Sequence, residues 1–239
     1  MGAAYLASEF SGRQPATVAI DVGISGVRFV ALLLVVFWCQ ELVAREVERR
    51  TVLLALTYPV PRSYYLLGRY FGIVTLAAVA IVVLGVLLCA SAFLAGRGYL
   101  QSTPIDLGKG LWLTLFFIWL DVSVVAAFTI LITTISTTPL LPLALGIAFA
   151  LSARSMGTAL AYLSDKNSGA SDLAPTFRPI VDGLRWILPD LGRFDIRVAA
   201  LYSQYPDTNA MIGAALNGLA YVAIMLSMAV IFFRRRQFE

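Results

Sequence analysis

Residues 71–95 read FGIVTLAAVAIVVLGVLLCASAFLA and contain no charged side chain. A run of about 18 or more apolar residues is typical of a helix that crosses a membrane. At about 1.5 Å per residue, a helix of this length covers the roughly 30 Å of hydrocarbon in a bilayer. The stretch therefore predicts a membrane-spanning helix.

Comparable apolar segments recur along the chain. Together with this one, they cover residues 22–44, 65–95, 110–136, 140–163 and 211–233. Hydrophobic residues make up 59% of the 239-residue chain and charged residues 13%, whereas a soluble chain is about 45–50% apolar and about 25% charged. We therefore expect an all-α, polytopic transmembrane helical bundle with five visible spans, forming one domain over residues 1–239.

Arginines gather where the apolar segments end. Arg234, Arg235 and Arg236 follow the last segment directly, and further arginines lie between the first two segments. Because Lys and Arg favour the cytoplasmic flank of a span, we expect a cytoplasmic C-terminus in a multi-pass protein of the inner (plasma) membrane. The same preference explains the net charge of +4, so we expect contact with membrane lipid and none with nucleic acid.

The chain opens with MGAAYLASEF, which has the composition of the end of an apolar helix. We expect that a preceding span is missing, so that the five visible spans are five of six and the first is truncated. The alternative is a short N-terminus that is naturally exported.

The sequence offers no catalytic constellation. Histidine is absent, which removes the commonest metal ligand and the usual general base near neutral pH. There is no Walker-type phosphate loop and no Ser-x-x-Lys arrangement. Cys39 and Cys89 lie within apolar runs, where buried side chains are expected rather than a disulfide or a metal pair. We therefore expect no enzyme activity, no metal site and no cofactor on this chain.

Two ionisable residues lie near the middle of predicted spans, Asp121 in the third and Arg154 in the fourth. A charge at bilayer depth costs at least about 2.5–3.5 kcal/mol on insertion scales, so each should face protein or water and find a partner. We hypothesise that the two pair across adjacent helices, either to fix helix register or as part of a transport path. Arg28 and Glu41 lie nearer the ends of the first span, where they can snorkel to the interface.

Two segments outside the spans have amphipathic patterning. In residues 46–58, apolar residues recur near helical spacing beside a charged face, and Pro59 and Pro61 then end that helix. In about residues 177–195, apolar residues after Pro179 recur at helical spacing, which suits a helix lying flat in the outer interface.

Several short motifs resemble those of the permease subunits of ABC-2-type transporters, and within that family the short single-domain form most resembles the permeases of the NosY type. They are Glu46-Val-Glu-Arg-Arg-Thr51, Tyr58-Pro-Val-Pro-Arg62, Tyr65-Leu-Leu-Gly-Arg69 and, before the last span, Leu188-Pro-Asp-Leu-Gly-Arg-Phe-Asp195. Compared with that family, we expect the N-terminal interfacial helix and most of the first span to be missing from the sequence as given.

The resemblance implies a homodimer, or pseudo-dimer, of six-helix permeases driven by separate cytoplasmic ATPase subunits that bind the ATP and Mg²⁺. It implies that about residues 46–58 form the coupling helix that docks on the ATPase. The implied coupling residues are Glu46, Glu48, Arg49, Arg50, Thr51, Pro59 and Arg62. A short charged helix braced by prolines can pass a rigid-body push into two attached spans, but the same segment could instead contact anionic lipid headgroups.

Our interpretation is therefore a permease subunit, with export as the expected direction. An ATP-independent secondary transporter or channel is an alternative, although such proteins usually have more polar residues or broken helices at the midplane. A membrane scaffold or assembly protein that transports nothing is the other alternative.

Overall fold

The computed structural model describes residues 2, 4, 6, 15–48, 61–95, 106–136, 138, 140–164 and 190–235, with side chains except at 47, 48, 62, 95 and 156–164. Every regular element from residue 15 onward in these ranges is helical. The elements are α2 (Pro15–Cys39), η1 (Gln40–Ala44), α3 (Arg45–Glu48), α5 (Arg62–Ala95), α6 (Lys109–Ile135), α7 (Leu140–Ser164), η3 (Leu191–Phe194), α9 (Arg197–Tyr202) and α10 (Thr208–Arg235).

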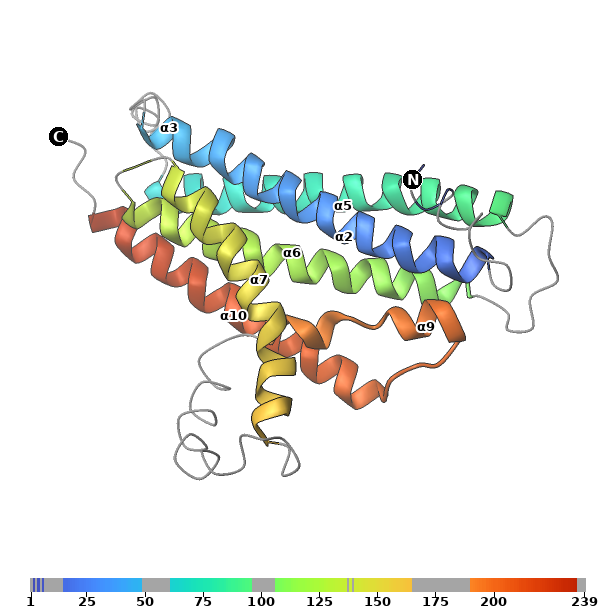
Figure 1. Cartoon of the computed structure of the whole chain (residues 1–239). Helices are drawn as coiled ribbons and strands as arrows, with labels where there is room; N and C mark the ends of the chain where they lie inside the picture. Colours follow the sequence, from blue (N-terminus) through green and yellow to red (C-terminus); the bar gives the residue numbers. More distant parts are fainter. Residues whose placement is uncertain are drawn as a thin grey trace.

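Four helical stretches are long and apolar enough to cross a membrane. They are Pro15–Ala44, Ser63–Leu94, Lys109–Ile135 and Thr208–Arg235, which confirms an all-α transmembrane bundle. The fourth expected span, 140–163, is helical as α7, and its apolar part within the described side chains is the shorter Leu140–Ser155. The far end of α7 projects away from the other helices (Figure 1).

Helix α6 occupies the centre of the bundle. It packs against α2, α5, α7 and α10 and also against the short helices η3 and α9, and its buried residues lie on all sides of the helix. By contrast, α5 exposes a row of large apolar side chains, among them Phe71, Val79 and Val86. Such a surface is suited to lipid rather than to water.

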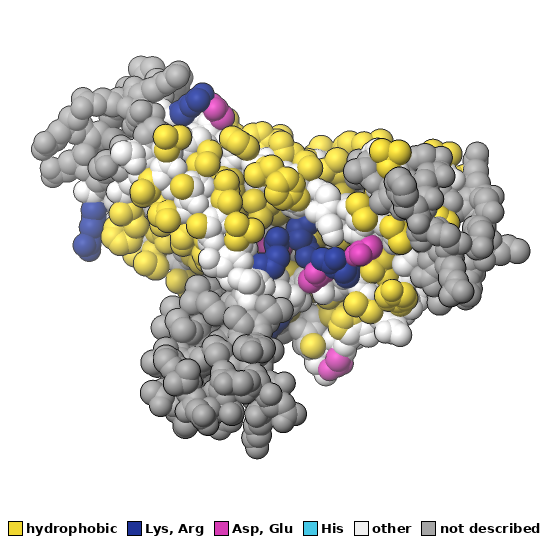
Figure 2. Space-filling view, in the orientation of Figure 1, with side chains coloured by type: hydrophobic (Ala, Val, Ile, Leu, Met, Phe, Trp, Pro, Cys, Tyr) yellow, Lys and Arg dark blue, Asp and Glu magenta, His cyan; other side chains and the backbone are white. Residues whose placement is uncertain are grey.

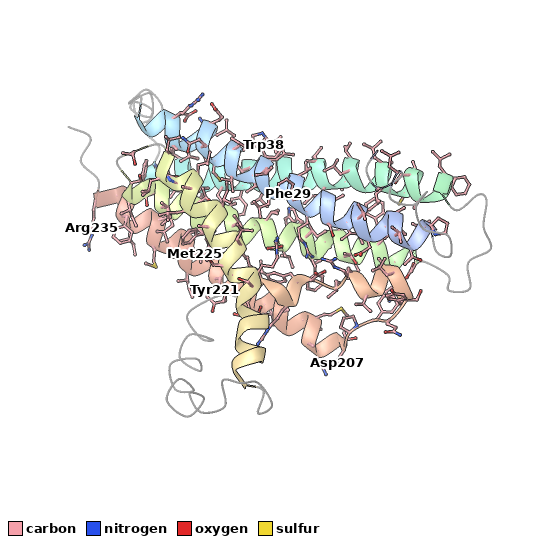
Figure 3. The ribbon with its side chains drawn as sticks, viewed as in Figure 1. Phe29, Trp38, Asp207, Tyr221, Met225 and Arg235 are labelled. Carbon is pink, nitrogen blue, oxygen red and sulfur yellow. The ribbon has the colours of Figure 1, made fainter. Side chains whose placement is uncertain are left out.

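Helices α2, α6 and α10 run in one direction and α5 in the other (Figure 1). As a result, α3, the start of α5 and the end of α10 meet at one end of the bundle, which we call the α3 end. Asp207 and Arg235 mark the two ends of α10 in Figure 3. Arg234 and Arg235 lie at the same end of the bundle as the start of the 46–58 segment. This agrees with the expectation that the C-terminus and the segment between the first two spans are on the same side of the membrane.

Candidate functional site

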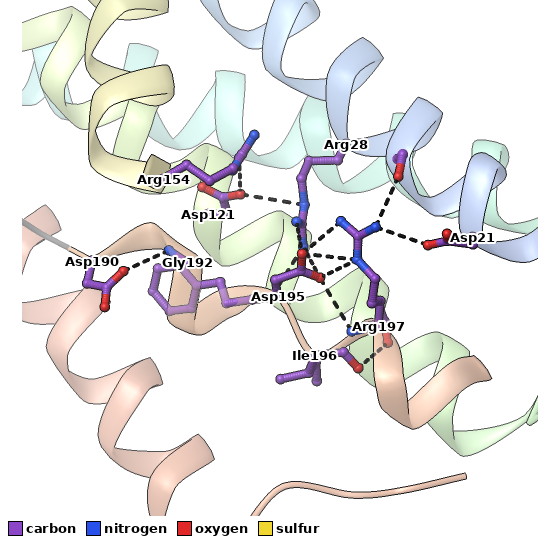
Figure 4. A network of polar contacts seen from close by, with 12 residues as sticks. Asp21, Arg28, Asp121, Arg154, Asp190, Gly192, Asp195, Ile196 and Arg197 are labelled. Atoms are coloured by element: carbon purple, nitrogen blue, oxygen red, sulfur yellow. Dashed lines mark hydrogen bonds and ion pairs between the residues drawn. The ribbon is translucent and has the colours of Figure 1, made fainter. Parts of the chain in front are cut away.

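The two charges expected within the spans meet in the structure. Asp121 lies midway along α6 and is fully buried, and Arg154 reaches it from α7 through an ion pair between its Nη2 and Asp121 Oδ2 (Figure 4). The fold brings them together because α7 packs against α6. A buried carboxylate is strongly disfavoured without such a partner.

A second arginine, Arg28 of α2, faces the same carboxylate. Its Nε lies 3.8 Å from Asp121 Oδ2, and its Nη1 lies 3.0 Å from Asp195 Oδ2. Its Nη2 also donates to the backbone oxygen of Phe194 at 3.4 Å. Arg28 is only 5% exposed, so the expectation that it snorkels to the interface is wrong. Helix α2 begins at Pro15, which places Arg28 near the middle of the span rather than near its end.

Asp195 continues the chain of charges outward to Arg197. The Nε of Arg197 donates to both oxygens of Asp195 at 3.0 Å, its Nη2 lies 2.8 Å from Oδ2, and its Nη1 lies 3.0 Å from Asp21 Oδ1 on α2. We call the connected set the charge network. Its members are Asp21, Arg28, Asp121, Arg154, Asp195 and Arg197. Three arginines face three aspartates, so the network carries no net charge when all are ionised.

Two members of the network come from a segment that does not span the membrane. Residues 190–202, here called the inserted segment, contain η3 and α9 and run from the middle of the bundle toward the end opposite the α3 end (Figure 1). At the inner end, Phe194 packs against Phe117, and a side chain at Gly218 would meet it at 2.6 Å. Gly218 lies ten residues into α10, or about 15 Å along that helix, so the inserted segment reaches deep into the bundle.

At its C-terminal end, the inserted segment is fixed to the start of α6. Asp106 donates its backbone N–H to the oxygen of Ala200 at 3.1 Å, and its carboxylate accepts from Gly108 N and Gly110 N at 3.0 and 2.9 Å. The hydroxyl of Tyr205 also donates to this carboxylate. That hydrogen bond, followed by those from the two glycines, holds the pKa of Asp106 below its ordinary value.

The described end of the 177–195 stretch, residues 190–195, buries part of its side chains within the bundle, whereas Arg193 remains exposed. Leu191 and Phe194 are buried between α6, α7 and α10. Irregular backbone at membrane depth is tolerated where protein covers it or where it lines a water-filled cavity. Residues 177–189 lie outside the described residues.

The charge network opens onto one side of the molecule. The side chains of Arg154 and Asp195 are each 28% exposed, that of Arg197 is 33% and that of Asp21 is 48%. Figure 2 shows Lys/Arg and Asp/Glu side chains gathered in the middle of a face that is otherwise largely hydrophobic. A charged surface at this depth requires cover by protein or contact with water.

Within the described residues, some polar atoms of the network have no hydrogen-bond partner. They are Asp121 Oδ1, Arg28 Nε and Arg154 Nε. The network can thus accept and donate further hydrogen bonds, but it contains no nucleophile with an adjacent base. No group of His, Cys, Asp or Glu suited to a metal occurs in the part of the chain that the structure describes.

The residues expected to couple to an ATPase are described only in part. Glu46 lies in α3 and contacts Tyr65 and Arg69 at the start of α5. The backbones of Glu48 and Arg62 are helical. The other coupling residues, Arg49, Arg50, Thr51 and Pro59, lie outside the described residues.

The sequence analysis did not identify Asp195 and Arg197 as members of the charge network, although a motif lies at this point of the chain. Asp195 closes the motif Leu188–Asp195, and Arg197 follows two residues later. The motif served only for the resemblance to a family, and the depth of Asp195 in the bundle depends on how the inserted segment packs against α6.

Residues 5–102 match a family model described as "ABC-2 membrane transporter related". No curated protein matches the chain. The matched range contains α2, the 46–58 segment and all of α5, whereas α6, α7 and the inserted segment lie beyond it. The N-terminal part of this multi-pass membrane protein is thus similar to ABC-2 membrane transporters, which supports an ABC-2-type permease family for the chain.

Proposed function

We propose that this chain is the membrane-spanning permease subunit of an ABC transporter, and that a separate cytoplasmic ATPase subunit supplies the energy. The observation that carries this proposal is the family match over residues 5–102. That range holds the segment with coupling-helix character, residues 46–58, and the two long spans on either side of it. A load applied to this segment would act directly on α2 and α5.

The partner side of the proposal follows from the charges. Arg234 and Arg235 at the α3 end favour the cytoplasm, which supports a cytoplasmic position for the two chain segments that flank residues 49–60. The charge network is partly exposed on one side at mid-depth, and we propose that a second copy of the chain provides the cover that such charges require. The proposed assembly is therefore a homodimer in the inner membrane with two ATPase subunits, which bind the ATP and Mg²⁺. Export and a NosY-type role belong to the same proposal.

ATP-independent secondary transport is a second candidate function. It is favoured by the charge network and by the broken backbone of the inserted segment, because secondary transporters bind substrate and coupling ions beside interrupted helices near the midplane. The structure has more charge at this depth than Asp121 and Arg154 alone would supply, and this strengthens the second candidate relative to the sequence-based expectation.

Affinity purification separates the two candidates. The tagged full chain is isolated at native expression from the membranes of its own host, and the co-purifying proteins are identified by mass spectrometry. The permease proposal predicts an ATPase with Walker motifs in amounts comparable to the chain. Recovery of the chain without such an ATPase, while it remains folded and membrane-bound, would favour secondary transport.

A further inference from the structure

Three helix ends are tied together at the α3 end through Glu46. One carboxylate oxygen of Glu46 accepts from the Tyr65 hydroxyl, and the other pairs with Nη2 of Arg69. The Tyr65 ring stacks on Phe233 near the end of α10, with ring centroids 6.0 Å apart and planes inclined by 16°. The guanidinium carbon of Arg69 lies 5.5 Å from the centre of the Tyr65 ring. This cluster thus joins α3, α5 and α10.

The cluster lies where it can connect the two chain segments on either side of residues 49–60. Glu46 lies just before residues 49–60, and Tyr65 and Arg69 lie in the first two turns of α5, just after them. The side chains of Glu46 and Arg69 are 27% and 35% exposed, so their ion pair is partly shielded from solvent. The contact joins the two chain segments that flank residues 49–60.

The helix that precedes Glu46 in the chain is irregular. Residues Gln40–Ala44 form a π-helical turn between α2 and α3, and such turns interrupt regular helices, frequently at functional sites. Gln40 is 6% exposed, and its Oε1 is a buried atom with no hydrogen-bond partner among the described residues. An unsatisfied buried amide lowers the stability of this turn.

We infer that Glu46, Tyr65 and Arg69 form a clamp that transmits displacement of residues 49–60 to α5 and α10, with the π-helical turn Gln40–Ala44 as the hinge. This inference rests on the proposed function, because it assumes that an ATPase moves that segment. The π-helical turn connects α3 to α2 weakly, whereas the ion pair and the ring stacking connect α3 firmly to α5. A displacement of α3 is therefore passed mainly to α5. Glu46 therefore acts on the permease itself instead of serving as an ATPase contact.

Two variants break the clamp without altering residues 46–58. Arg69→Gln removes the ion pair, and Tyr65→Phe removes the hydroxyl while leaving a ring to stack on Phe233. Arg69→Lys retains the positive charge and should restore function. The matched control is Arg45→Gln, which removes an arginine from an exposed i,i+4 pair with Glu41 at the same end of the bundle.

The readout is the movement of α5 relative to α6 when the assembly binds nucleotide. Spin labels are placed at Phe71→Cys on α5 and Ile135→Cys on α6, both exposed positions, in a chain whose native cysteines are replaced by alanine. Their separation is measured by electron paramagnetic resonance in the assembly purified with its ATPase, with and without ATP and vanadate. Bound ATPase is quantified in every sample.

The expected result is a nucleotide-dependent change in label separation in the parent chain, in Arg69→Lys and in Arg45→Gln. Arg69→Gln and Tyr65→Phe should lose this change while retaining as much ATPase as the parent chain. An unchanged nucleotide response in Arg69→Gln would overturn the clamp and leave the permease proposal standing. The same conclusion would follow if the two clamp variants lost their bound ATPase, or if the parent chain bound the ATPase but showed no change in label separation. Failure of the parent chain to capture any ATPase would instead overturn the proposed function, and the clamp with it.

Discussion

Replacement of Arg28 by methionine should destabilise the protein strongly, because its guanidinium is buried against Asp121 and Asp195. The substitution leaves two arginines facing three aspartates. Removing one partner of a buried ion pair costs about 3–5 kcal/mol, whereas an exposed pair contributes about 0–1 kcal/mol. We expect Arg28→Met to lower the free energy of unfolding by about 3–5 kcal/mol, since the guanidinium is 5% exposed.

The assay is unfolding of the purified full chain in mixed micelles by SDS titration, followed by tryptophan fluorescence. The control is Arg193→Met, because the Arg193 side chain is 62% exposed and pairs with Asp190 three residues away. It should change the free energy by less than about 1 kcal/mol. The double variant Arg28→Met with Asp121→Asn restores the charge balance, so its loss should be smaller than the sum of the single losses by about 0.5–3 kcal/mol.

A loss in Arg28→Met no larger than that in Arg193→Met would refute this reasoning. It would mean that Arg28 reaches solvent or lipid headgroups, as the sequence alone had indicated. Strict additivity in the double variant would show that Arg28 and Asp121 do not interact.

Other variants test neighbouring parts of the account. Asp121→Asn and Arg154→Gln should each reduce the yield of folded protein, and exchanging the two charges should partly restore it, whereas additive damage in the exchanged variant would contradict the pairing. Gly110→Ala places a Cβ 2.4 Å from a backbone oxygen of α9, so its thermal midpoint should fall, and an unchanged midpoint would show that the inserted segment is not held there. Because the pKa of Asp106 is lowered in the folded protein, its stabilising contribution is present above the ordinary value of 3.8 and is lost as the pH falls through the folded-state pKa. Tyr205→Phe should weaken that acid dependence in a thermal-unfolding series over pH, and an identical series would contradict the hydrogen bond.

The spans could be predicted from the sequence because hydrophobicity is a local property. A run such as residues 71–95 has no other stable environment than lipid or a large core, and it forms most of α5. The meeting of Asp121 and Arg154 was also predictable, since each charge lies mid-span and needs a partner.

The other members of the charge network could not be predicted from the sequence, because their positions depend on tertiary structure. The expected span began at residue 22, whereas the helix continues back to Pro15 and Asp21 is paired with Arg197. That difference moves Arg28 from the end of the span to its middle. The depth of Asp195 depends on close packing of Phe194 beside Gly218, a contact between residues that no local pattern relates.

The central claim is that energy enters through residues 46–58, and photocrosslinking in native membranes tests it most directly. A photoreactive amino acid replaces residue 54 within that segment and, as a control, Tyr205 at the opposite end of the bundle. The account predicts a crosslink from residue 54 to an ATPase with Walker motifs and none from residue 205. Crosslinks from residue 54 to phospholipid alone would contradict it and would identify the segment as a lipid-headgroup contact.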